Sequence, residues 1–500
     1  MSRPNILLIT TDQQRWDTLG CYGAPGAHTP NLDRLAAEGT LFEQCYCTNP
    51  ICTPSRSSMW TGLHLPGHGV YRVHDILPDD KVLFSRRLRD AGYDTALFGK
   101  LHVSGHMWEA ERRHPNDGFR VYEWAPDPPG FLGADTAYLT WLQQRHPEVR
   151  ERFRQRGANP GHLPIEAHFT TWVAERTIAF LEQMREPGKP FFCCMGIFDP
   201  HDPYGNHPKE MERLINIEKL APAVAVDEPF EGRPESHRRH RDCCYLGPAS
   251  EFTPQRVAEF RRGYHAAVAL VDMQVGRVLD ALEGLGMADD TLVIFASDHG
   301  DMLGDHGLMV KGGFFYDGST RVPLIVRGPG AERGRRVKAL AQLHDIAATA
   351  LRASGAPAEA VREGAPDSVD LRDEQALRRR GYAACLYRNS IICADHVTRT
   401  KGYFDPPILA TMWREGAYKL NVYHSAPEGT PRGELFHMDE DPHELRNLWN
   451  DASARAIRDR MTQRLDEWLA AQDYRAVAQR PGAMPSGASY FGVGRADSRG

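Results

Sequence analysis

The sequence predicts an α/β protein in which helices cover both faces of a large, mostly parallel sheet, with a smaller α+β unit near the C-terminal end. Two observations predict it. Short, continuously apolar runs are typical of strands buried on both faces, and here they alternate with helical patterns along the chain. In addition, 500 residues are more than one hydrophobic core usually organises.

The expected elements follow in chain order. Residues 5–10 form a buried strand, and Thr29 caps a short helix that begins at Pro30 and ends at Gly39. Thr253 and Pro254 begin a long helix with apolar residues at helical spacing. The remaining expected elements are strands at 40–46, 94–98, 191–198 and 291–296, and a helix at about 169–185.

Composition and charge narrow the classes of partner. The formal net charge is only −6, so nothing favours nucleic acid or a membrane surface as a partner. The apolar run after Asn5 has four residues, which is shorter than a secretory signal requires, so we expect a cytoplasmic protein. The ten cysteines include no paired Cys-x-x-Cys arms, and we expect free thiols.

Four polar clusters follow four of the expected strands. In parallel sheets the chemistry gathers at the carboxyl ends of the strands, so these clusters are expected at one rim. They are Asp12-Gln13, Lys100-Leu101-His102, Asp199-Pro200-His201-Asp202-Pro203 and Ser297-Asp298-His299-Gly300-Asp301.

A fifth cluster, Pro50 to Gly62, contains Cys52-Thr53-Pro54-Ser55-Arg56. This stretch resembles the signature of the formylglycine-dependent sulfatases of the alkaline phosphatase superfamily, which include arylsulfatases, choline-sulfatases and phosphonate monoester hydrolases. Residues 92–102 resemble the second family signature, with Leu101 where a tryptophan is usual. The resemblance implies an alkaline-phosphatase-like catalytic domain over 1–375, a small domain with an antiparallel sheet and helix over 376–475, and an extended tail over 476–500. In segments at about 103–165 and 202–250 we identify no family motif, and the resemblance implies that such segments lie over the pocket and shape specificity.

The resemblance implies a nucleophile and a metal site. Cys52 would be oxidised to formylglycine, whose hydrated form attacks sulfur with one hydroxyl and later expels sulfate by deprotonation of the other. Asp12, Asp298 and His299 would hold one divalent cation together with an oxygen of residue 52. Gln13 either coordinates through its carbonyl oxygen or hydrogen-bonds the substrate. An oxygen-rich set suits calcium or magnesium, and a histidine leaves room for manganese; calcium is the first choice.

The remaining charged residues would divide the other tasks. Arg56, on a helix that begins at the motif, would reach back to residue 52, and Lys100 and Lys311 would bind sulfuryl oxygens. His102 would take the proton that releases sulfate, and His201, which also touches substrate, would protonate the leaving group, with Lys311 as second choice. The structural alternatives are a turn-capping role for His201 and a solvated loop lysine for Lys311.

The expected activity is therefore that of an arylsulfatase-like sulfuric ester hydrolase acting on a small-molecule sulfate ester after a maturation enzyme has modified Cys52. A phosphonate monoester or phosphodiester hydrolase with the same formylglycine is the alternative; those relatives often replace the Lys100-x-His102 pair with hydroxyl residues. A non-catalytic anion binder and a hydrolase using the bare Cys52 thiolate are two further alternatives. The tail is expected either to be disordered or to wrap a neighbouring subunit, which leaves a homo-oligomer open.

Three further local features have both a structural and a ligand-binding interpretation. His237 to Arg241 reads as a solvated loop that could instead hold an anionic substrate tail. Trp108 and Trp124 read as parts of small local cores, with an aryl pocket as the alternative. The Gly312-Gly313 pair would allow a ligand to approach the backbone closely.

Overall fold

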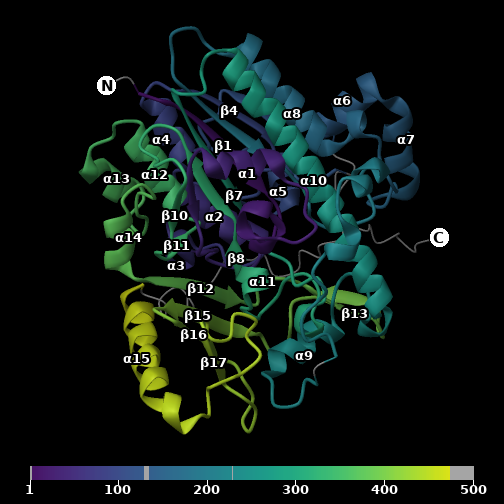
Figure 1. Ribbon diagram of the computed structural model, residues 1–500, viewed down its shortest axis with the longest axis vertical. Coiled ribbons are helices and arrows are strands. Elements are labelled where there is room, and N and C mark those ends of the chain that lie inside the picture. Colours follow the sequence, from purple (N-terminus) through teal and green to yellow (C-terminus); the bar gives the residue numbers. More distant parts are fainter. Residues whose placement is uncertain (1–2, 129–134, 228, 473–500) are drawn as a thin grey trace, which may run out of the picture.

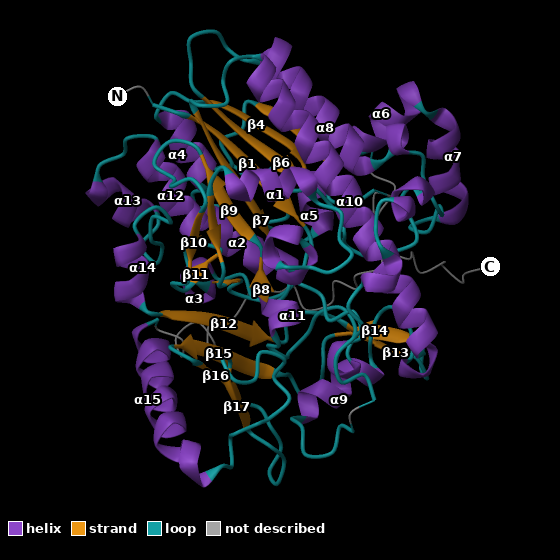
Figure 2. Ribbon diagram, in the orientation of Figure 1, coloured by secondary structure: helices purple, strands orange, loops and turns teal. Residues whose placement is uncertain are grey.

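The computed structural model describes residues 3–128, 135–227 and 229–472, and it confirms the α/β class with a large, mostly parallel sheet (Figure 1; Figure 2). The sheet has eight strands in the order β10-β2-β9-β7-β1-β6-β4-β5. β7, β1, β6, β4 and β5 run parallel, whereas β9 is antiparallel to both of its neighbours. In sheet order the strands are β10 Arg335–Val337, β2 Thr40–Phe42, β9 Leu324–Arg327, β7 Thr291–Ser297, β1 Asn5–Thr11, β6 Phe191–Gly196, β4 Asp94–Gly99 and β5 Val121–Trp124.

Helices cover both faces of this sheet, which explains why its central strands are apolar throughout. Along β1, Ile6 and Leu8 face one core while Leu7 and Ile9 face the other. The first core is covered by α2 Cys52–Thr61, α4 Phe84–Asp90, α12 Asp345–Ala353, α13 Ala358–Gly364 and α14 Glu374–Arg380. The second is covered by α1 Pro30–Ala37, α6 Ala137–Arg145, α7 Pro147–Arg156, α8 Phe169–Ala179 and α10 Pro254–Gly284.

The expected C-terminal antiparallel sheet is present below the main sheet in Figure 1. Its strands, in order, are β12 Tyr382–Arg388, β15 Leu409–Glu415, β16 Tyr418–Tyr423 and β17 Gly433–His437. Helix α15 Arg455–Ala471 packs on it through Leu465 and Trp468. The domain boundary near residue 375 stays a prediction, and the tail over 476–500 lies outside the described residues.

Smaller elements complete the chain. They are the three-stranded sheet of β11 Ala341–Gln342, β3 Cys45–Tyr46 and β8 Arg321–Val322, the hairpin of β13 Cys393–Asp395 and β14 Thr400–Gly402, and helices α3 Leu65–His68, α5 His106–Glu111, α9 Glu235–Asp242 and α11 Asp317–Thr320. Within the described ranges, no helix is long and apolar enough to cross a membrane.

Three local expectations need correction. The strand expected at 40–46 is two strands, because the chain leaves the large sheet after Phe42 and enters the small one at Cys45. The helix expected at 169–185 is α-helical only to Ala179 and continues as a wider π-type turn. Helix α1 begins at Pro30 as expected, but the Thr29 hydroxyl accepts from the Gly20 backbone N–H, 2.8 Å away, rather than capping the helix.

Candidate active site

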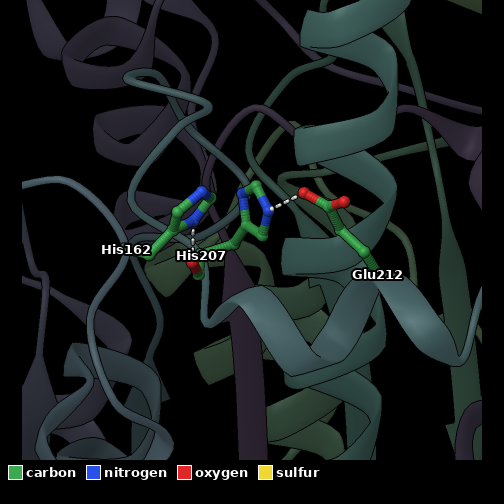
Figure 3. A group of neighbouring side chains, drawn as sticks. All are labelled: His162, His207 and Glu212. Atoms are coloured by element: carbon green, nitrogen blue, oxygen red, sulfur yellow. Dashed lines mark hydrogen bonds and ion pairs between the residues drawn. The ribbon is translucent and has the colours of Figure 1, made fainter.

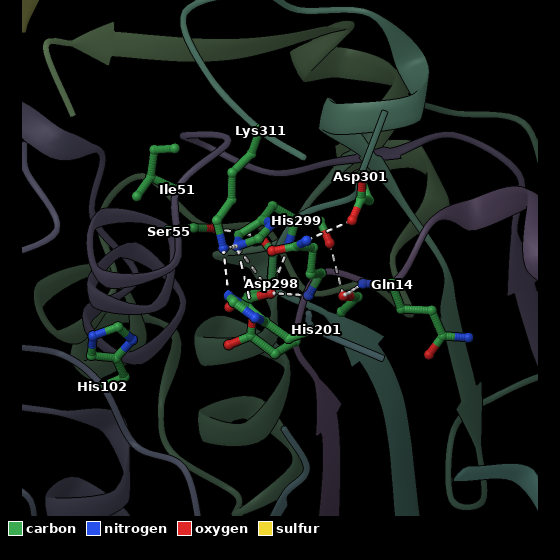
Figure 4. A network of polar contacts seen from close by, with 12 residues as sticks. Gln14, Ile51, Ser55, His102, His201, Asp298, His299, Asp301 and Lys311 are labelled. Atoms are coloured by element: carbon green, nitrogen blue, oxygen red, sulfur yellow. Dashed lines mark hydrogen bonds and ion pairs between the residues drawn. The ribbon is translucent and has the colours of Figure 1, made fainter. Parts of the chain in front are cut away.

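The four polar clusters lie at one edge of the large sheet because β7, β1, β6 and β4 are neighbours and run parallel. Asp12, Lys100 and Asp298 each directly follow the last residue of a strand. His201 lies on the loop after β6, and Figure 4 shows it beside Asp298, His299 and Lys311. Their side chains therefore meet at the carboxyl ends of parallel strands, which is where ligand sites lie in such sheets.

Asp12, Asp298 and His299 form a buried group, here called the rim cluster, whose ligand atoms lie within 4.8 Å of one another. The Asp12 Oδ1 atom is buried and has no hydrogen-bond partner among the described residues. His299 Nδ1 donates to the Gly300 carbonyl at 2.9 Å, so Nε2 carries the lone pair that could ligate a metal; Lys311 Nζ lies 3.2 Å from this nitrogen. An orphaned carboxylate oxygen beside a second carboxylate and an oriented imidazole fits a divalent cation.

Gln13 is oriented by two acids that the sequence reasoning did not single out. Its side-chain nitrogen donates to Asp301 at 2.5 Å and to Asp202 at 3.4 Å. These acids in turn accept from the hydroxyls of Tyr204, at 2.6 Å, and Tyr245, at 2.7 Å. The side-chain oxygen Oε1 of Gln13 is buried and has no hydrogen-bond partner in the described part of the chain. This fits coordination of a metal ion better than a contact with substrate. Both acids stand inside the polar clusters already identified, so their positions after the strands were the available signal.

Arg56 pairs with the carboxylates of the rim cluster rather than simply reaching back along its helix. Its Nε donates to Asp298 at 2.7 Å and its Nη2 to Asp12 at 3.3 Å, and Lys100 Nζ lies 2.8 Å from Asp12. Burial alone would raise the pKa of Asp12, but Lys100 and the other nearby cations hold it well below its usual value. Two buried anions are thus matched by two buried cations.

Cys52 is the first residue of α2, lines the cavity described below and is 4% exposed. Burial raises the pKa of its thiol above the ordinary value, despite the opposing effect of Lys311 and Lys100. The thiol is therefore neutral at physiological pH, which argues against a hydrolase that uses the bare thiolate.

His102 has one defined tautomer. The Thr53 hydroxyl donates to the Val73 carbonyl at 2.8 Å, so at its 3.0 Å contact with His102 Nε2 it must accept. Nε2 therefore carries the proton, and Nδ1 is the basic nitrogen. Burial, followed by His106, whose ring centroid lies 3.9 Å away at an interplanar angle of 32°, lowers the pKa of His102 well below its usual value. A neutral imidazole with a free basic nitrogen suits the role of proton acceptor.

Lys311 lies between two imidazoles and is 4% exposed, so the alternative of a solvated loop lysine is wrong. Its Nζ is 3.0 Å from His201 Nε2 and 3.2 Å from His299 Nε2. His201 Nδ1 donates to the Asp202 carbonyl at 2.8 Å, as a turn-stabilising residue would. Its Nε2 nonetheless faces Lys311, so the turn and the site use different nitrogens.

The segment expected as a solvated loop at 237–241 is part of helix α9, and its two histidines point inward. His240 Nε2 accepts from the Gly313 backbone N–H at 2.7 Å. A Cβ on Gly312 would lie 2.7 Å from the His240 ring, so the glycine pair makes room for this histidine rather than for a ligand. His240 thereby holds the loop that carries Lys311.

A cavity of about 880 Å³ opens at this rim. Cys52, Lys100, His102, His201 and Lys311 line it, together with residues from segments 103–165 and 202–250. Neither Trp108 nor Trp124 is among its described lining residues. Trp124 ends strand β5, packs against the first core of the large sheet and donates to Glu109 at 2.9 Å, so it belongs to the main core rather than to a small local one. The Arg112 guanidinium lies over the Trp108 ring, and a local core around Trp108 stays a prediction.

Comparisons with known proteins agree with this geometry. A sequence model of the sulfatase family matches residues 4–356, and one described as "N-sulphoglucosamine sulphohydrolase, C-terminal" matches residues 304–471. A choline-sulfatase of Rhizobium meliloti is 31% identical over 467 residues, covering 89% of this chain and 82% of its own. An arylsulfatase of Clostridium perfringens is 30% identical over 472 residues, covering 90% of each chain. The crystal structure of a phosphonate monoester hydrolase of Agrobacterium radiobacter superposes with a TM-score of 0.72 at 26% identity, covering 94% of this chain and 96% of that one.

Proposed function

The chain belongs to the sulfatase family, and from this premise we propose that it hydrolyses sulfate monoesters to an alcohol or phenol and sulfate. The observation that carries the proposal is the pair Lys100 and His102, which lines the same cavity as Cys52. A buried ammonium and a neutral imidazole suit a sulfuryl group that carries negative charge and must later be released.

The rim cluster and Gln13 supply the donors for one divalent cation. Two carboxylates, an amide oxygen and one imidazole form an oxygen-rich set, for which we propose calcium first and manganese or magnesium as alternatives. When bound, the cation would supply Lewis-acid charge, and a formylglycine made from Cys52 would supply the attacking hydroxyl. Arg56 pairs with both carboxylates and fixes their positions.

His201 and Lys311 are proposed to share the proton that the leaving oxygen needs. Burial, and then Lys311, lowers the pKa of His201 well below its usual value, so this ring is neutral at pH 7. Its Nε2 is the acceptor for the Lys311 ammonium, 3.0 Å away. These contacts favour Lys311, the second choice from the sequence, as the group that carries the proton, with His201 orienting it.

A phosphonate monoester hydrolase is the second candidate, because a protein with that title shares the fold at 26% identity and because Gln13 replaces a carboxylate. A panel of aryl and alkyl sulfates, phosphate diesters and phosphonate monoesters tests the choice. We expect the largest kcat/KM on a sulfate monoester, and we expect Lys100→Thr to reduce that activity more than any activity on phosphonates. If the wild-type protein showed its highest kcat/KM on a phosphonate monoester, the assignment would be reversed.

A further inference from the structure

A second group of metal-ligating side chains lies in the wall of the cavity, away from the rim cluster. His162, His207 and Glu212 each offer one ligand atom, and these atoms lie within 4.8 Å of one another (Figure 3). All three residues line the cavity. His162 comes from the 103–165 segment, and the other two come from the 202–250 segment, so the group joins these two segments of the cavity wall.

Backbone carbonyls fix the tautomers of both histidines. His162 Nδ1 donates to the His207 carbonyl at 2.8 Å, and His207 Nδ1 donates to the Tyr204 carbonyl at 2.8 Å. A hydrogen bond from the second ring nitrogen to a carbonyl is the usual support of a metal-ligating histidine. In both rings Nε2 is therefore the nitrogen available to a metal.

The contact between His207 and Glu212 indicates that a positive charge belongs between them. His207 Nε2 lies 2.9 Å from Glu212 Oε1. With Nδ1 protonated, a neutral His207 would turn a lone pair toward a carboxylate oxygen, which is repulsive unless a second proton or a metal cation lies between the two atoms.

Helix α10 makes room for this arrangement. A Cβ on Gly263 would lie 2.1 Å from the Tyr204 carbonyl oxygen and 3.2 Å from the His207 ring, so only glycine permits the close approach. The turn that carries His207 is thus held against the helix by backbone contacts. A ligand set that is fixed in advance in this way loses little freedom on binding an ion.

We propose that His162, His207 and Glu212 form a second metal site that takes a divalent transition metal, with Zn²⁺ as the best match. Two imidazole nitrogens and one carboxylate oxygen are ligands that zinc prefers, and three protein ligands leave a fourth position open. That position faces the cavity, where water or an oxygen of a bound molecule would occupy it. The bound metal would also tie the two cavity-wall segments together.

Zinc binding to the full-length protein tests the proposal. After removal of metals with a chelator and dialysis, the protein is titrated with Zn²⁺ alone, and bound zinc is counted by elemental analysis and calorimetry. We expect the wild-type protein to bind one equivalent of Zn²⁺ more than the His162→Gln or Glu212→Gln variant. His162 is exposed and Glu212→Gln preserves shape, so circular dichroism spectra should show that both variants fold.

His146→Gln is the matched control, because His146 lies 3.8 Å from Glu148 but belongs to no group of three ligands among the described residues. It should bind as much zinc as the unmodified chain. Lys209 Nζ lies 2.7 Å from Glu212 Oε1 and competes with the metal, so Lys209→Met should bind the extra equivalent roughly 2–5-fold more tightly, the usual range for an exposed ion pair. Equal zinc stoichiometry in the unmodified chain, His162→Gln and Glu212→Gln would overturn the proposal. The rim cluster is intact in all these variants, so that result would leave the proposed hydrolase function untouched.

Discussion

Replacing Asp298 with alanine should cost stability as well as activity, because this carboxylate does more than offer a metal ligand. It is fully buried, its Oδ2 accepts from Arg56 at 2.7 Å, and its Oδ1 accepts from the backbone N–H groups of Gln13, at 3.0 Å, and His299, at 2.9 Å. Removing one partner of a buried ion pair costs about 3–5 kcal/mol, because the other charge remains buried. Arg56 keeps three weaker contacts, with Asp12 and the Thr11 carbonyl at 3.3 Å each and with the Lys100 carbonyl at 3.5 Å, which favours the lower part of that range.

Urea unfolding of chelator-treated protein, followed by tryptophan fluorescence, measures this effect without a contribution from bound metal. Asp298→Asn is the matched control. Its oxygen can still accept from the two backbone N–H groups, so it should lose roughly 1–3 kcal/mol less than the alanine variant. Both variants should be inactive. An alanine variant that unfolds at the same urea concentration as the unmodified chain would refute the argument from the buried pair, and one that retained full activity would refute the metal site.

Three further predictions concern the nucleophile, the proton transfers and the pH dependence. Active protein should carry formylglycine at Cys52, seen by mass spectrometry as a loss of about 18 Da from the peptide, and Cys52→Ser should stall after one transfer; a fully active, unmodified thiol would contradict this. Lys311→Ala removes the proposed proton carrier, so it should lose roughly 10²–10⁴-fold more kcat with an alkyl sulfate than with a nitrophenyl sulfate, and His201→Ala, which removes its orienting partner, should show the same dependence with a smaller loss. The loss in His102→Ala should not depend on the leaving group; the same dependence in all three variants would disprove the assigned roles. Burial lowers the pKa of His240 to about 3, so below about pH 6.5 this imidazole takes up a proton in the unfolded state but not in the folded state. The folded state is therefore favoured by the neutral ring above pH 6.5 and loses stability as the pH falls. The stability lost between pH 7.5 and 5 should be about 2 kcal/mol smaller in His240→Gln, whose carbonyl can still accept from Gly313; an equal loss would contradict the argument.

The sequence allowed the strands of the sheet and the residues at their carboxyl ends to be predicted, because both depend on local patterns. An apolar run of a strand buried on both faces is visible in the sequence. The residue that follows it lies at the rim of the sheet regardless of how the other segments fold. The partners of those residues depend on contacts between distant segments. Nothing near Arg56 in the sequence indicates that it lies between Asp12 and Asp298, and nothing near Gly313 indicates His240.

The same limit explains the errors at the segment level. Residues 237–241 are rich in charge, which is typical of an exposed loop, yet His237 and His240 both pack beside aromatic rings, and His240 also packs against the glycine pair. Residues 40–46 look like one strand because periodicity does not report which sheet each half joins. His162 and His207 are 45 residues apart, and only the fold brings them together.

The burial of helix α2 has a consequence for when the protein is made active. All ten of its residues are buried, and Ser55 donates to the Asp298 carbonyl at 2.7 Å, so strand β7 and the turn after it close over the Cys52 motif. If Cys52 is modified as proposed, the maturation enzyme would need to reach it before these contacts form. Arg56 and Asp298 are 242 residues apart, which at a ribosomal rate of 5–20 residues per second corresponds to about 12–48 s. Any modification of Cys52 therefore competes with translation and folding, and faster synthesis should lower the fraction of molecules that become active.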